Sequence, residues 1–479
     1  MFPFNSIKAY HRALIAREIT AEQAVRYYLA RIEENKHLNA FLEVFTEEAV
    51  IRAKELDQQI YEGGPLGKMH GVVVGLKDVI SYKNHKLSAS SKILENYTSI
   101  YNASVVEKLL AEGAIIIGRQ NCDEFAMGSS NENSAFGNVL NAADNTRVPG
   151  GSSGGSAVCI QAGLCMISLG SDTGGSVRQP ADFCGIVGFK PSYGRISRFG
   201  LIAYASSFDQ IGIFSKTVAD AALTLEVIAG EDQYDSTVSN LPVPPYSLLL
   251  NEDKKYKIAY ISQTLEHPSL NEEIKTSILQ FIDKLRADGH TVEAIDFEYL
   301  DYIVPTYYVL TTAEASTNLS RFDGIKFGYT SKKAPDDLTN FYKNNRSEGF
   351  GKEVKRRIML GTFVLSALYY DSYFTKAQQV RRIVSEKSKE IFAQFDAIIS
   401  PNSPITAFKF GEKNNDPTEM YLADIYTVFA NLAGIPGISL PLFESAFGMP
   451  FGIQVMTNQM EESTLLNISE KMVQIAGKI

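Results

Sequence analysis

The sequence predicts an α/β protein in which helices cover a β-sheet. Of its 479 residues, 45% are hydrophobic and 21% are charged, so the chain can bury a substantial core and fits neither a disordered protein nor a coiled coil. The second observation is the order of segments between residues 72 and 118, where a strand-like run, a helical run and a second strand-like run follow one another. That order is typical of a sheet with helices packed on it.

The first 60 residues read as helices. Thr20 is expected to begin one of them, because Thr20 and Gln23 have the spacing of a capping box. The apolar residues that follow recur at helical spacing: Ala24, Val25, Tyr28, Leu29 and Ile32.

The strand–helix–strand unit follows a turn-rich cluster at 63–71. The β-branched run VVVGLKDVI (72–80) predicts a buried strand with Lys77 near its C-terminal end. A second capping box is expected at Ser104, and the helix that follows should end at Gly113, before the strand AIIIG (114–118).

The remaining elements are read from shorter patterns. Residues 127–200 are dense in Gly and Ser, yet too apolar between the clusters to be a linker. Helices are expected at 156–163, 217–230 and 271–288 and over most of 299–379, and strands at 165–170, 257–262, 397–400 and 451–456.

Charge and cysteine content exclude several classes of protein. A net charge of −9 makes the chain a poor candidate for binding nucleic-acid backbones over a wide surface. Four cysteines are too few for a disulfide scaffold, and none has zinc-site spacing. The N-terminus has no apolar core of a signal peptide, and the longest apolar stretch, 157–169, is too short to span a membrane. We therefore expect a cytoplasmic enzyme that uses no metal and no membrane.

Lysine rather than histidine is the candidate base. No histidine lies in the Gly/Ser-rich region, so nothing indicates a Ser-His-Asp triad, and a serine nucleophile needs a base. Burial in an apolar strand should lower the pKa of Lys77. A neutral Lys77 could then take a proton from Ser152, which takes one from Ser176.

Ser176 lies where a nucleophile would be exposed, after a strand and a Gly-rich turn and before a helix. The backbone N–H groups there converge on one point and could form an oxyanion hole: Thr173, Gly174, Gly175 and Ser176.

Other interpretations of these motifs exist. A Gly/Ser run is often a flexible loop, and a lysine at a strand end often reaches the surface. GGSSGGS could form a phosphate cradle, but it lacks the GK[ST] ending. Asp172-Thr173-Gly174 resembles an aspartic-protease triplet, but no second such triplet follows to supply the other carboxylate.

Three separated segments resemble the amidase signature family of Ser-Ser-Lys hydrolases: GLKD (75–78), GGSSGGSA (150–157) and GSDTGGSVRQPADFCGIVGFKPSYGRIS (170–197). The resemblance continues through SSFDQIG, TVADAALTLEVIAG, MYLADIYTVFANLAGIPGISLP and GMPFGIQVM, and is weaker around 232–300. It implies that Ser176 is the nucleophile, Ser152 the bridging serine after a cis peptide, and Lys77 the base.

The resemblance also implies the fold: one large amidase-signature domain over 1–479, with a mixed twisted sheet covered by helices on both faces. Its expected parts are N-terminal helices (1–62), a catalytic core (63–231), a variable, helix-rich substrate-side region (232–395) and a C-terminal return to the sheet (396–479).

Within the family, three segments are similar to the glutaminase (A) subunits of aspartyl/glutamyl-tRNA amidotransferases: 127–137, 314–328 and 353–381. Such a subunit hydrolyses glutamine without a cofactor and works with B and C subunits. The misacylated tRNA, Glu-tRNA(Gln) or Asp-tRNA(Asn), is bound mainly through the B subunit, and ATP and Mg²⁺ are used at a partner subunit.

The same resemblance places a glutamine pocket. Arg357 would bind the α-carboxylate and Asp424 the α-ammonium, with Tyr308 in the wall. Met127, Gly128 and Ser129 would complete it. Neighbouring duplicates leave the register open, so that Arg356 or Tyr307 could be the residue instead.

Two other functions remain open on the sequence alone. A free-standing amidase acting on a small acyl or aryl amide would share the catalytic trio. A non-catalytic scaffold that binds tRNA-modifying partners would form no acyl-enzyme.

Overall fold

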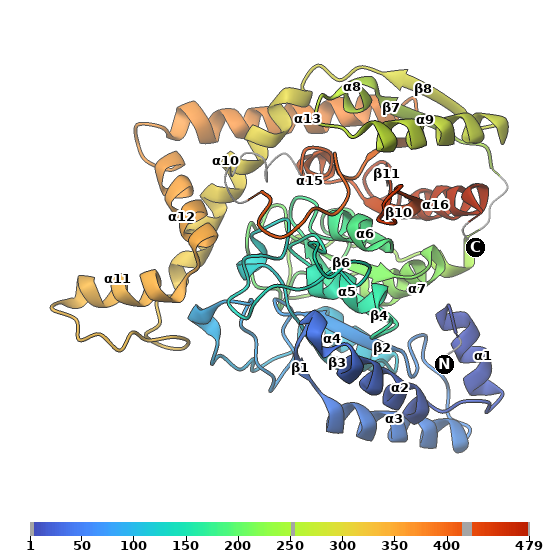
Figure 1. Ribbon diagram of the computed structural model, residues 1–479, viewed down its shortest axis with the longest axis horizontal. Coiled ribbons are helices and arrows are strands. Elements are labelled where there is room, and N and C mark those ends of the chain that lie inside the picture. The colour runs from blue at the N-terminus through green and yellow to red at the C-terminus, as the bar shows by residue number, and fades with distance from the viewer. Residues whose placement is uncertain (1–3, 251–253, 414–423, 478–479) are drawn as a thin grey trace.

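A mixed sheet of eleven strands runs through the molecule in the order β1-β3-β2-β4-β6-β5-β10-β11-β9-β7-β8 (Figure 1). The computed structural model describes residues 4–250, 254–413 and 424–477. The strands are β1 (Phe41–Val44), β2 (Val73–Lys77), β3 (Ile115–Gln120), β4 (Ile167–Asp172), β5 (Val187–Lys190), β6 (Gln210–Ser215), β7 (Lys257–Ile261), β8 (Thr291–Ile295), β9 (Ala397–Pro401), β10 (Gly437–Glu444) and β11 (Pro450–Met456).

The sheet is parallel near both ends and antiparallel in the middle. β2 pairs in parallel with β3 and β4, and β7 pairs in parallel with β8 and β9. The antiparallel pairs run from β4 through β6, β5, β10 and β11 to β9. The mixed sheet predicted from the family resemblance is therefore confirmed.

Both faces of the sheet are buried. In β2, Val74 and Leu76 lie in one apolar cluster, while Val73 lies in the other. This follows from the strand's two-residue period, which sends successive side chains to opposite faces. The VVV run is therefore apolar throughout, as expected of a strand covered on both sides.

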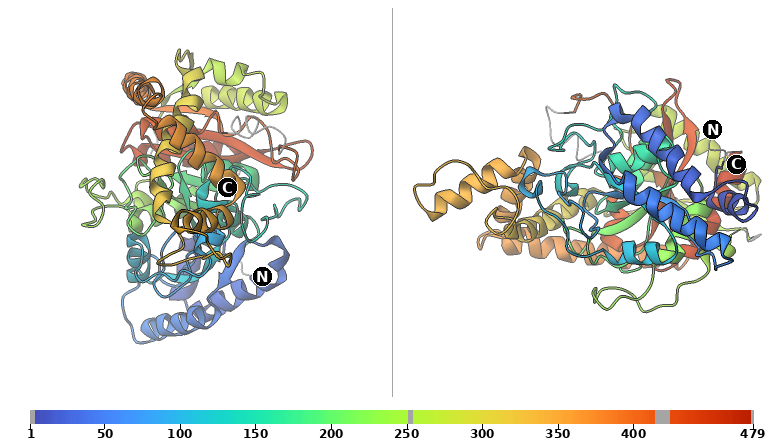
Figure 2. Two further views of the ribbon diagram at one scale, coloured as in Figure 1. Left: turned by 90° about the vertical axis from the view of Figure 1, so that its left-hand side faces the viewer. Right: turned by 90° about the horizontal axis from the view of Figure 1, so that it is seen from below.

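Helices supply that cover (Figures 1 and 2). Those of the N-terminal and central parts are α1 (Ile7–Ile15), α2 (Ala21–Glu34), α3 (Thr46–Tyr61), α4 (Ser104–Ala111), α5 (Gly154–Gln161), α6 (Arg178–Cys184), α7 (Val218–Ile228), α8 (Ser262–Glu266) and α9 (Glu272–Ala287). Those that follow are α10 (Leu300–Asn318), α11 (Leu338–Gly349), α12 (Lys352–Val364), α13 (Lys376–Phe392), α15 (Val428–Ala433) and α16 (Glu462–Ala476).

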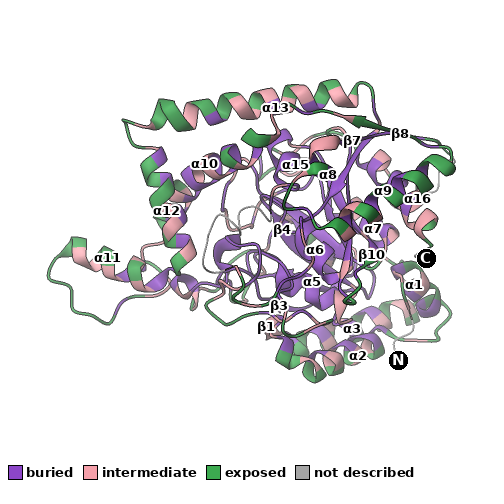
Figure 3. Ribbon diagram, turned by 45° about the horizontal axis from the view of Figure 1, so that its top comes forward, coloured by how far each residue is buried: buried purple, intermediate pink, exposed green. Residues whose placement is uncertain are grey.

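Two short helices differ from the rest in their burial. All seven residues of α6 are buried, and so are Gly154 to Ile160 of α5, whereas most residues of α11 and α13 are exposed or only partly buried (Figure 3). α5 and α6 begin just after Ser152 and Ser176, respectively. Each serine therefore lies in a turn that leads directly into a buried helix.

Most predicted elements are present with small changes in their bounds. The capping box of α2 is confirmed, because the Gln23 N–H donates to Thr20 Oγ1 at 3.1 Å and the Thr20 N–H to Gln23 Oε1 at 3.0 Å. The capping box at Ser104 is wrong. Ala103 is the N-cap of α4, and the Ser104 hydroxyl donates instead to the Asp232 carboxylate.

The all-helical interpretation of the first 60 residues is also wrong in one place. β1 lies there and pairs antiparallel with β3 at the sheet edge. It has only four residues, all partly buried, and so has too little alternation to be recognised. Among the described residues, no helix combines the length and apolarity that a membrane span needs.

Candidate active site

The ends of two parallel strands bring the candidate base to the Gly/Ser-rich region. Lys77 is the last residue of β2, and Ser171 lies near the end of the adjacent β4. The Lys77 Nζ lies 2.7 Å from Ser152 Oγ, 2.9 Å from Ser153 Oγ and 2.9 Å from Ser171 Oγ. The expectation of a surface-reaching lysine is thus excluded, because this side chain is 0% exposed.

The proton of one of these three hydroxyls is already engaged. Ser153 Oγ donates to the Ser171 carbonyl oxygen at 3.1 Å, so it can only accept from Lys77. A neutral lysine amine has one lone pair, which can accept a hydrogen bond from a neighbouring hydroxyl. Ser152 and Ser171 are the two hydroxyls placed to give it one.

Burial controls the charge of Lys77. It lowers the pKa of the amine to about 8, against the opposing effect of nearby acidic groups, chiefly Cys122 and Asp123. A lysine with this pKa has a substantial neutral fraction near neutral pH, as a general base requires.

The peptide between Gly151 and Ser152 is cis, which confirms the expectation drawn from the resemblance. The loop is held from two sides: the Gly151 N–H donates to Gln179 Oε1 at 3.0 Å, and the Ser152 carbonyl accepts from the Asp123 N–H at 3.0 Å. A Cβ at position 151 would lie 2.2 Å from Asp123 Oδ2. Only glycine fits there.

Ser176 lies on the turn between β4 and α6. Its side chain is half-buried, and its hydroxyl has no hydrogen-bond partner among the described residues. By contrast, Ser152 is fully buried against Lys77. Of the two serines, Ser176 is therefore the one that a substrate can reach.

The turn that carries Ser176 is fixed by Asp172. The Asp172 carboxylate accepts from the Gly175 N–H at 2.9 Å and from the Val177 N–H at 3.2 Å. In this arrangement the Gly175 N–H faces Asp172, while the N–H groups of Thr173, Gly174 and Ser176 make no hydrogen bond to a described residue. These three are the free donors of the predicted oxyanion hole.

A buried arginine, which the sequence analysis did not single out, anchors Asp172. The Arg178 side chain is 0% exposed and donates to Asp172 through Nε at 3.1 Å and Nη2 at 2.9 Å. Although burial alone would raise the pKa of Asp172, the guanidinium brings it down to about 2. Arg178 also donates to the Thr427 carbonyl, Asn431 Oδ1 and Gln454 Oε1. A charged residue just after a Gly/Ser turn was the available signal.

The predicted glutamine pocket places its residues around one carboxylate. Ser129 Oγ donates to Asp424 Oδ1 at 2.9 Å, and the Tyr308 hydroxyl of α10 donates to Asp424 Oδ2 at 2.9 Å. Burial raises the pKa of Asp424 to about 6, against these hydrogen bonds and the nearby Arg357.

Arg357, on α12, faces the same site. Its Nη1 donates to the Tyr204 hydroxyl at 2.7 Å and its Nε to Glu353 Oε1 at 2.9 Å, and its guanidinium lies 5.5 Å from the centre of the Tyr308 ring. Arg356 is partly exposed and, unlike Arg357, has no hydrogen bond or ring contact with Tyr204 or Tyr308 among the described residues, so Arg357 is the better candidate for the pocket.

Tyr307 and Tyr308, like the two arginines, differ in what their side chains contact. Tyr308 contacts Asp424, whereas Tyr307 packs on the nucleophile turn: a Cβ at Gly174 would lie 2.4 Å from the Tyr307 ring. The positions of these side chains therefore favour Tyr308 and Arg357, rather than Tyr307 and Arg356, as the pocket residues.

The segment Met127–Ser129 connects the pocket with the Ser152 loop. The Ser129 carbonyl accepts from Gln179 Nε2 at 2.9 Å, and the same Gln179 amide binds the Gly151 N–H through its oxygen. Met127 is buried, and a Cβ at Gly128 would lie 2.3 Å from the Asp123 carboxyl carbon. One glutamine side chain thus joins the two walls of the site.

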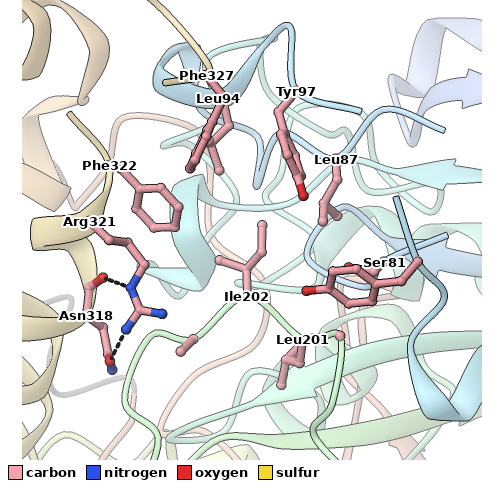
Figure 4. A pocket seen from close by; sticks show the side chains of 13 residues that line it. Ser81, Leu87, Leu94, Tyr97, Leu201, Ile202, Asn318, Arg321, Phe322 and Phe327 are labelled. Atoms are coloured by element: carbon pink, nitrogen blue, oxygen red, sulfur yellow. Dashed lines mark hydrogen bonds between the residues drawn. The ribbon is translucent and has the colours of Figure 1, made fainter. Parts of the chain in front are cut away.

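A separate cavity of about 200 Å³ lies between residues 81–101, the loop at 200–203 and the end of α10 (Figure 4). Its walls are mainly apolar, and its one charged residue, Arg321, is hydrogen-bonded to Asn318. None of the catalytic candidates lines it. Among the described residues, no three His, Cys, Asp or Glu side chains are grouped so that they could hold a metal ion.

Residues 23–466 of the chain match the protein family described as "Amidase". Among curated proteins, the A subunit of glutamyl-tRNA(Gln) amidotransferase from Chlorobium phaeobacteroides is 49% identical over 471 residues, covering 98% of each chain. The protein of the same description from Prosthecochloris aestuarii is 49% identical over 478 residues, covering 99% of this chain and 100% of that one.

Solved structures are also similar to this chain over nearly its whole length. The crystal structure of the glutamyl-tRNA(Gln) amidotransferase A subunit from Thermotoga maritima is 39% identical, has a TM-score of 0.77, and covers 95% of this chain and 91% of its own. A structure described as a vestigial protein complex related to an s-triazine catabolic enzyme has a TM-score of 0.87 at 26% identity, with 98% of each chain covered.

Proposed function

Because this chain belongs to the amidase signature family, we propose that it is an enzyme that hydrolyses the side-chain amide of glutamine, as the A subunit of a tRNA-dependent amidotransferase. One observation carries the proposal: hydrogen bonds through Gln179 and Thr427 connect the loops of Ser152 and Ser176 with a buried pocket that holds a carboxylate, Asp424, and a guanidinium, Arg357. The serines suit amide cleavage, and the pocket suits the charged head of a free amino acid. The relatives' description supports the same assignment.

In the first step, neutral Lys77 takes the Ser152 proton while Ser152 takes the proton of Ser176. Ser176 Oγ forms a bond to the side-chain carbonyl carbon of glutamine, and the carbonyl oxygen becomes an oxyanion. The N–H groups of Gly174 and Ser176 stabilise it, with Thr173 completing the turn. The Gly175 N–H takes no part, because it is bonded to Asp172.

The second step breaks the carbon–nitrogen bond. The relay returns a proton to the leaving nitrogen, since ammonia leaves far more readily than an amide anion. A glutamyl ester on Ser176 remains. Water, deprotonated through the same relay, then cleaves the ester, restores the Ser176 hydroxyl and releases glutamate. The balance is glutamine plus water to glutamate plus ammonia.

Recognition uses charge at the other end of the substrate. Asp424 accepts the α-ammonium and Arg357 binds the α-carboxylate, with Tyr308 between them. Met127, Gly128 and Ser129 form the facing wall. Simple acyl or aryl amides lack both charges and would leave these groups unpaired.

The ammonia is consumed elsewhere. We assign the chain to a cytoplasmic complex with B and C subunits, in which a misacylated Glu-tRNA(Gln), held mainly by the B subunit, is amidated with ATP and Mg²⁺ at a partner. The net charge of −9 supports this division, because an acidic subunit is poorly suited to hold tRNA. No cofactor takes part in the glutaminase step.

Intact-mass measurement together with an ammonia assay tests the proposal. The chain, alone and with its partner subunits, is incubated with glutamine and quenched. We expect ammonia release and a glutamyl adduct on Ser176. An adduct formed only from acyl or aryl amides without an amino-acid head would identify a free-standing amidase. No adduct from any amide, even with partners present, would identify a non-catalytic scaffold.

A further inference from the structure

The turn Asp424–Thr427 has a functional contact at each end. Asp424 accepts the hydrogen bonds of Ser129 and Tyr308. Three residues later, the Thr427 hydroxyl donates to the Gly174 carbonyl at 2.6 Å, and its oxygen lies 3.2 Å from the Asp424 carbonyl. The Thr427 N–H also donates to the Asp424 carbonyl at 3.1 Å, which closes the turn. This four-residue turn therefore connects the predicted substrate pocket with the turn that carries Ser176.

The peptide between Gly174 and Gly175 is held on both sides. Its carbonyl accepts from Thr427 Oγ1, and its N–H donates to Asp172 Oδ1 at 2.9 Å. Because a peptide group is planar, fixing both ends fixes its rotation. The neighbouring N–H groups of Gly174 and Ser176 make no hydrogen bond to a described residue and stay available to a substrate. Thr427 thus orients the oxyanion donors without touching a reacting atom.

A ring of hydrogen bonds makes this arrangement rigid. Arg178 donates to the Thr427 carbonyl at 2.7 Å and to Asp172, which in turn holds the Gly175 N–H. Every member is buried, and Thr427 is 0% exposed. The close fit extends to Gly175, where a Cβ would lie 2.2 Å from Thr427 Oγ1. A shift of Thr427 must therefore move the nucleophile turn.

We propose that Thr427 is a positioning residue that couples binding of the substrate's α-ammonium at Asp424 to the geometry of the Gly174–Ser176 oxyanion donors. The inference rests on the proposed function and deepens it. When the ammonium binds the Asp424 carboxylate, it restrains that side chain. The Asp424–Thr427 turn transmits the restraint to the Gly174 carbonyl. A substrate with the amino group is then cleaved faster at saturation, in addition to being bound more tightly.

The probe is glutaramate, which is glutamine without its α-amino group. Wild-type protein, assembled with its partner subunits, should show at least about fivefold higher kcat with glutamine than with glutaramate, the lower end of ordinary coupling between sites. Equal kcat values with a difference in KM alone would overturn the coupling, and this measurement needs no variant.

Thr427→Val removes the hydroxyl at nearly constant volume. We expect the glutamine-to-glutaramate ratio of kcat to fall at least about fivefold. We also expect Asp424→Asn to lower kcat with glutamine by a smaller factor in the Thr427→Val protein than in the wild type. Thr427→Ser should restore the ratio. Thr224→Val, which removes another buried threonine hydroxyl in α7, should leave the ratio unchanged. A Thr427→Val protein that loses activity equally toward both substrates would contradict the inference.

The two hypotheses fail differently. A wild-type complex that releases no ammonia from glutamine disproves the proposed function. A complex that hydrolyses glutamine, but whose preference over glutaramate is the same with threonine or valine at 427, disproves only the coupling.

Discussion

Lys77 Nζ lies 2.7 Å from Ser152 Oγ, and neither side chain is exposed to solvent. Water cannot supply or remove the proton at this contact directly, so proton transfer has to pass along the serines. The rate should then depend on one lysine whose pKa burial has lowered to about 8. Four predictions test this arrangement, the pocket beside it and a buried carboxyl on α6.

Glutamine hydrolysis should increase with pH through the Lys77 titration. In the proposed mechanism Lys77 is the neutral base, so the active form is present above a pKa of about 8 and is lost as the pH falls below it. A kcat/KM profile from about pH 6 to about pH 10 checks this. Lys77→Met should abolish the rise and lower the rate at least about 100-fold. A twofold loss would rule out the lysine base.

Ser176→Ala should abolish ammonia release and leave the fold intact, because the hydroxyl makes no hydrogen bond to a described residue. Thermal melting and the far-ultraviolet circular dichroism spectrum should match those of the wild type. Removing Ser152 differs, since its buried hydroxyl bonds to Lys77 and its loss should also change stability. An active Ser176→Ala protein would end the assignment of the nucleophile.

Asp424→Asn should raise the KM for glutamine about 10- to 100-fold, because one charged partner of the α-ammonium is lost. The wild-type KM should also rise below about pH 6, where protonation neutralises a carboxyl whose pKa is raised to about 6. The KM for glutaramate, which has no ammonium, provides the control. If its KM rises equally, Asp424 does not recognise the amino group.

Asp182, on the helix α6 that follows Ser176, offers a test of stability. Burial raises its pKa to about 7, above the unfolded value of about 3.8. Its contribution to the free energy of unfolding is therefore greatest below about pH 4 and is lost as the pH rises through 7. Asp182→Asn should remove this dependence and stabilise the protein at pH 8 by about 2–4 kcal/mol.

The neighbourhood of Asp182 can accept the amide. Asn402 Nδ2 donates to Asp182 Oδ1 at 3.1 Å, and Asn402 Oδ1 has no hydrogen-bond partner among the described residues. An amide at 182 keeps one oxygen that can accept from Asn402 Nδ2 or from the Gly452 N–H, which also bonds to this carboxyl. Urea denaturation of both proteins at about pH 5 and about pH 8 measures the difference, and parallel pH profiles would contradict the raised pKa.

Local patterns predicted the elements that carry strong periodicity or turn chemistry. The β2 run, the helix start at Thr20 and the nucleophile turn are each determined by neighbouring residues. β1 was missed because its four residues owe their strand conformation to pairing with β3, a contact more than 70 positions away. The Ser104 cap failed because Asp232 provides a better partner for the hydroxyl.

The residues of the candidate site also fall into two groups, those that the sequence singled out and those that it did not. Lys77, Ser152 and Ser176 could be singled out because each is an unusual residue in its segment. Arg178 had only the weak signal of a charged residue after a Gly/Ser turn, and Thr427 had none, since its partner Gly174 lies 253 positions away. No local pattern distinguishes a buried arginine that pairs with Asp172 from a surface one. The choice between Tyr307 and Tyr308 likewise needed the position of Asp424.

Thr427 and Asp424 come from the last eighth of the chain, whereas Lys77 comes from the first sixth. During synthesis, a nascent polypeptide can carry Lys77, Ser152 and Ser176 out of the ribosome while the turn that completes their surroundings is still untranslated. Such an incomplete product would have a nucleophile without an aligned oxyanion hole or a recognition carboxylate. The nucleophile turn and the recognition carboxylate therefore reach their hydrogen-bonded arrangement only after nearly the whole chain has been synthesised.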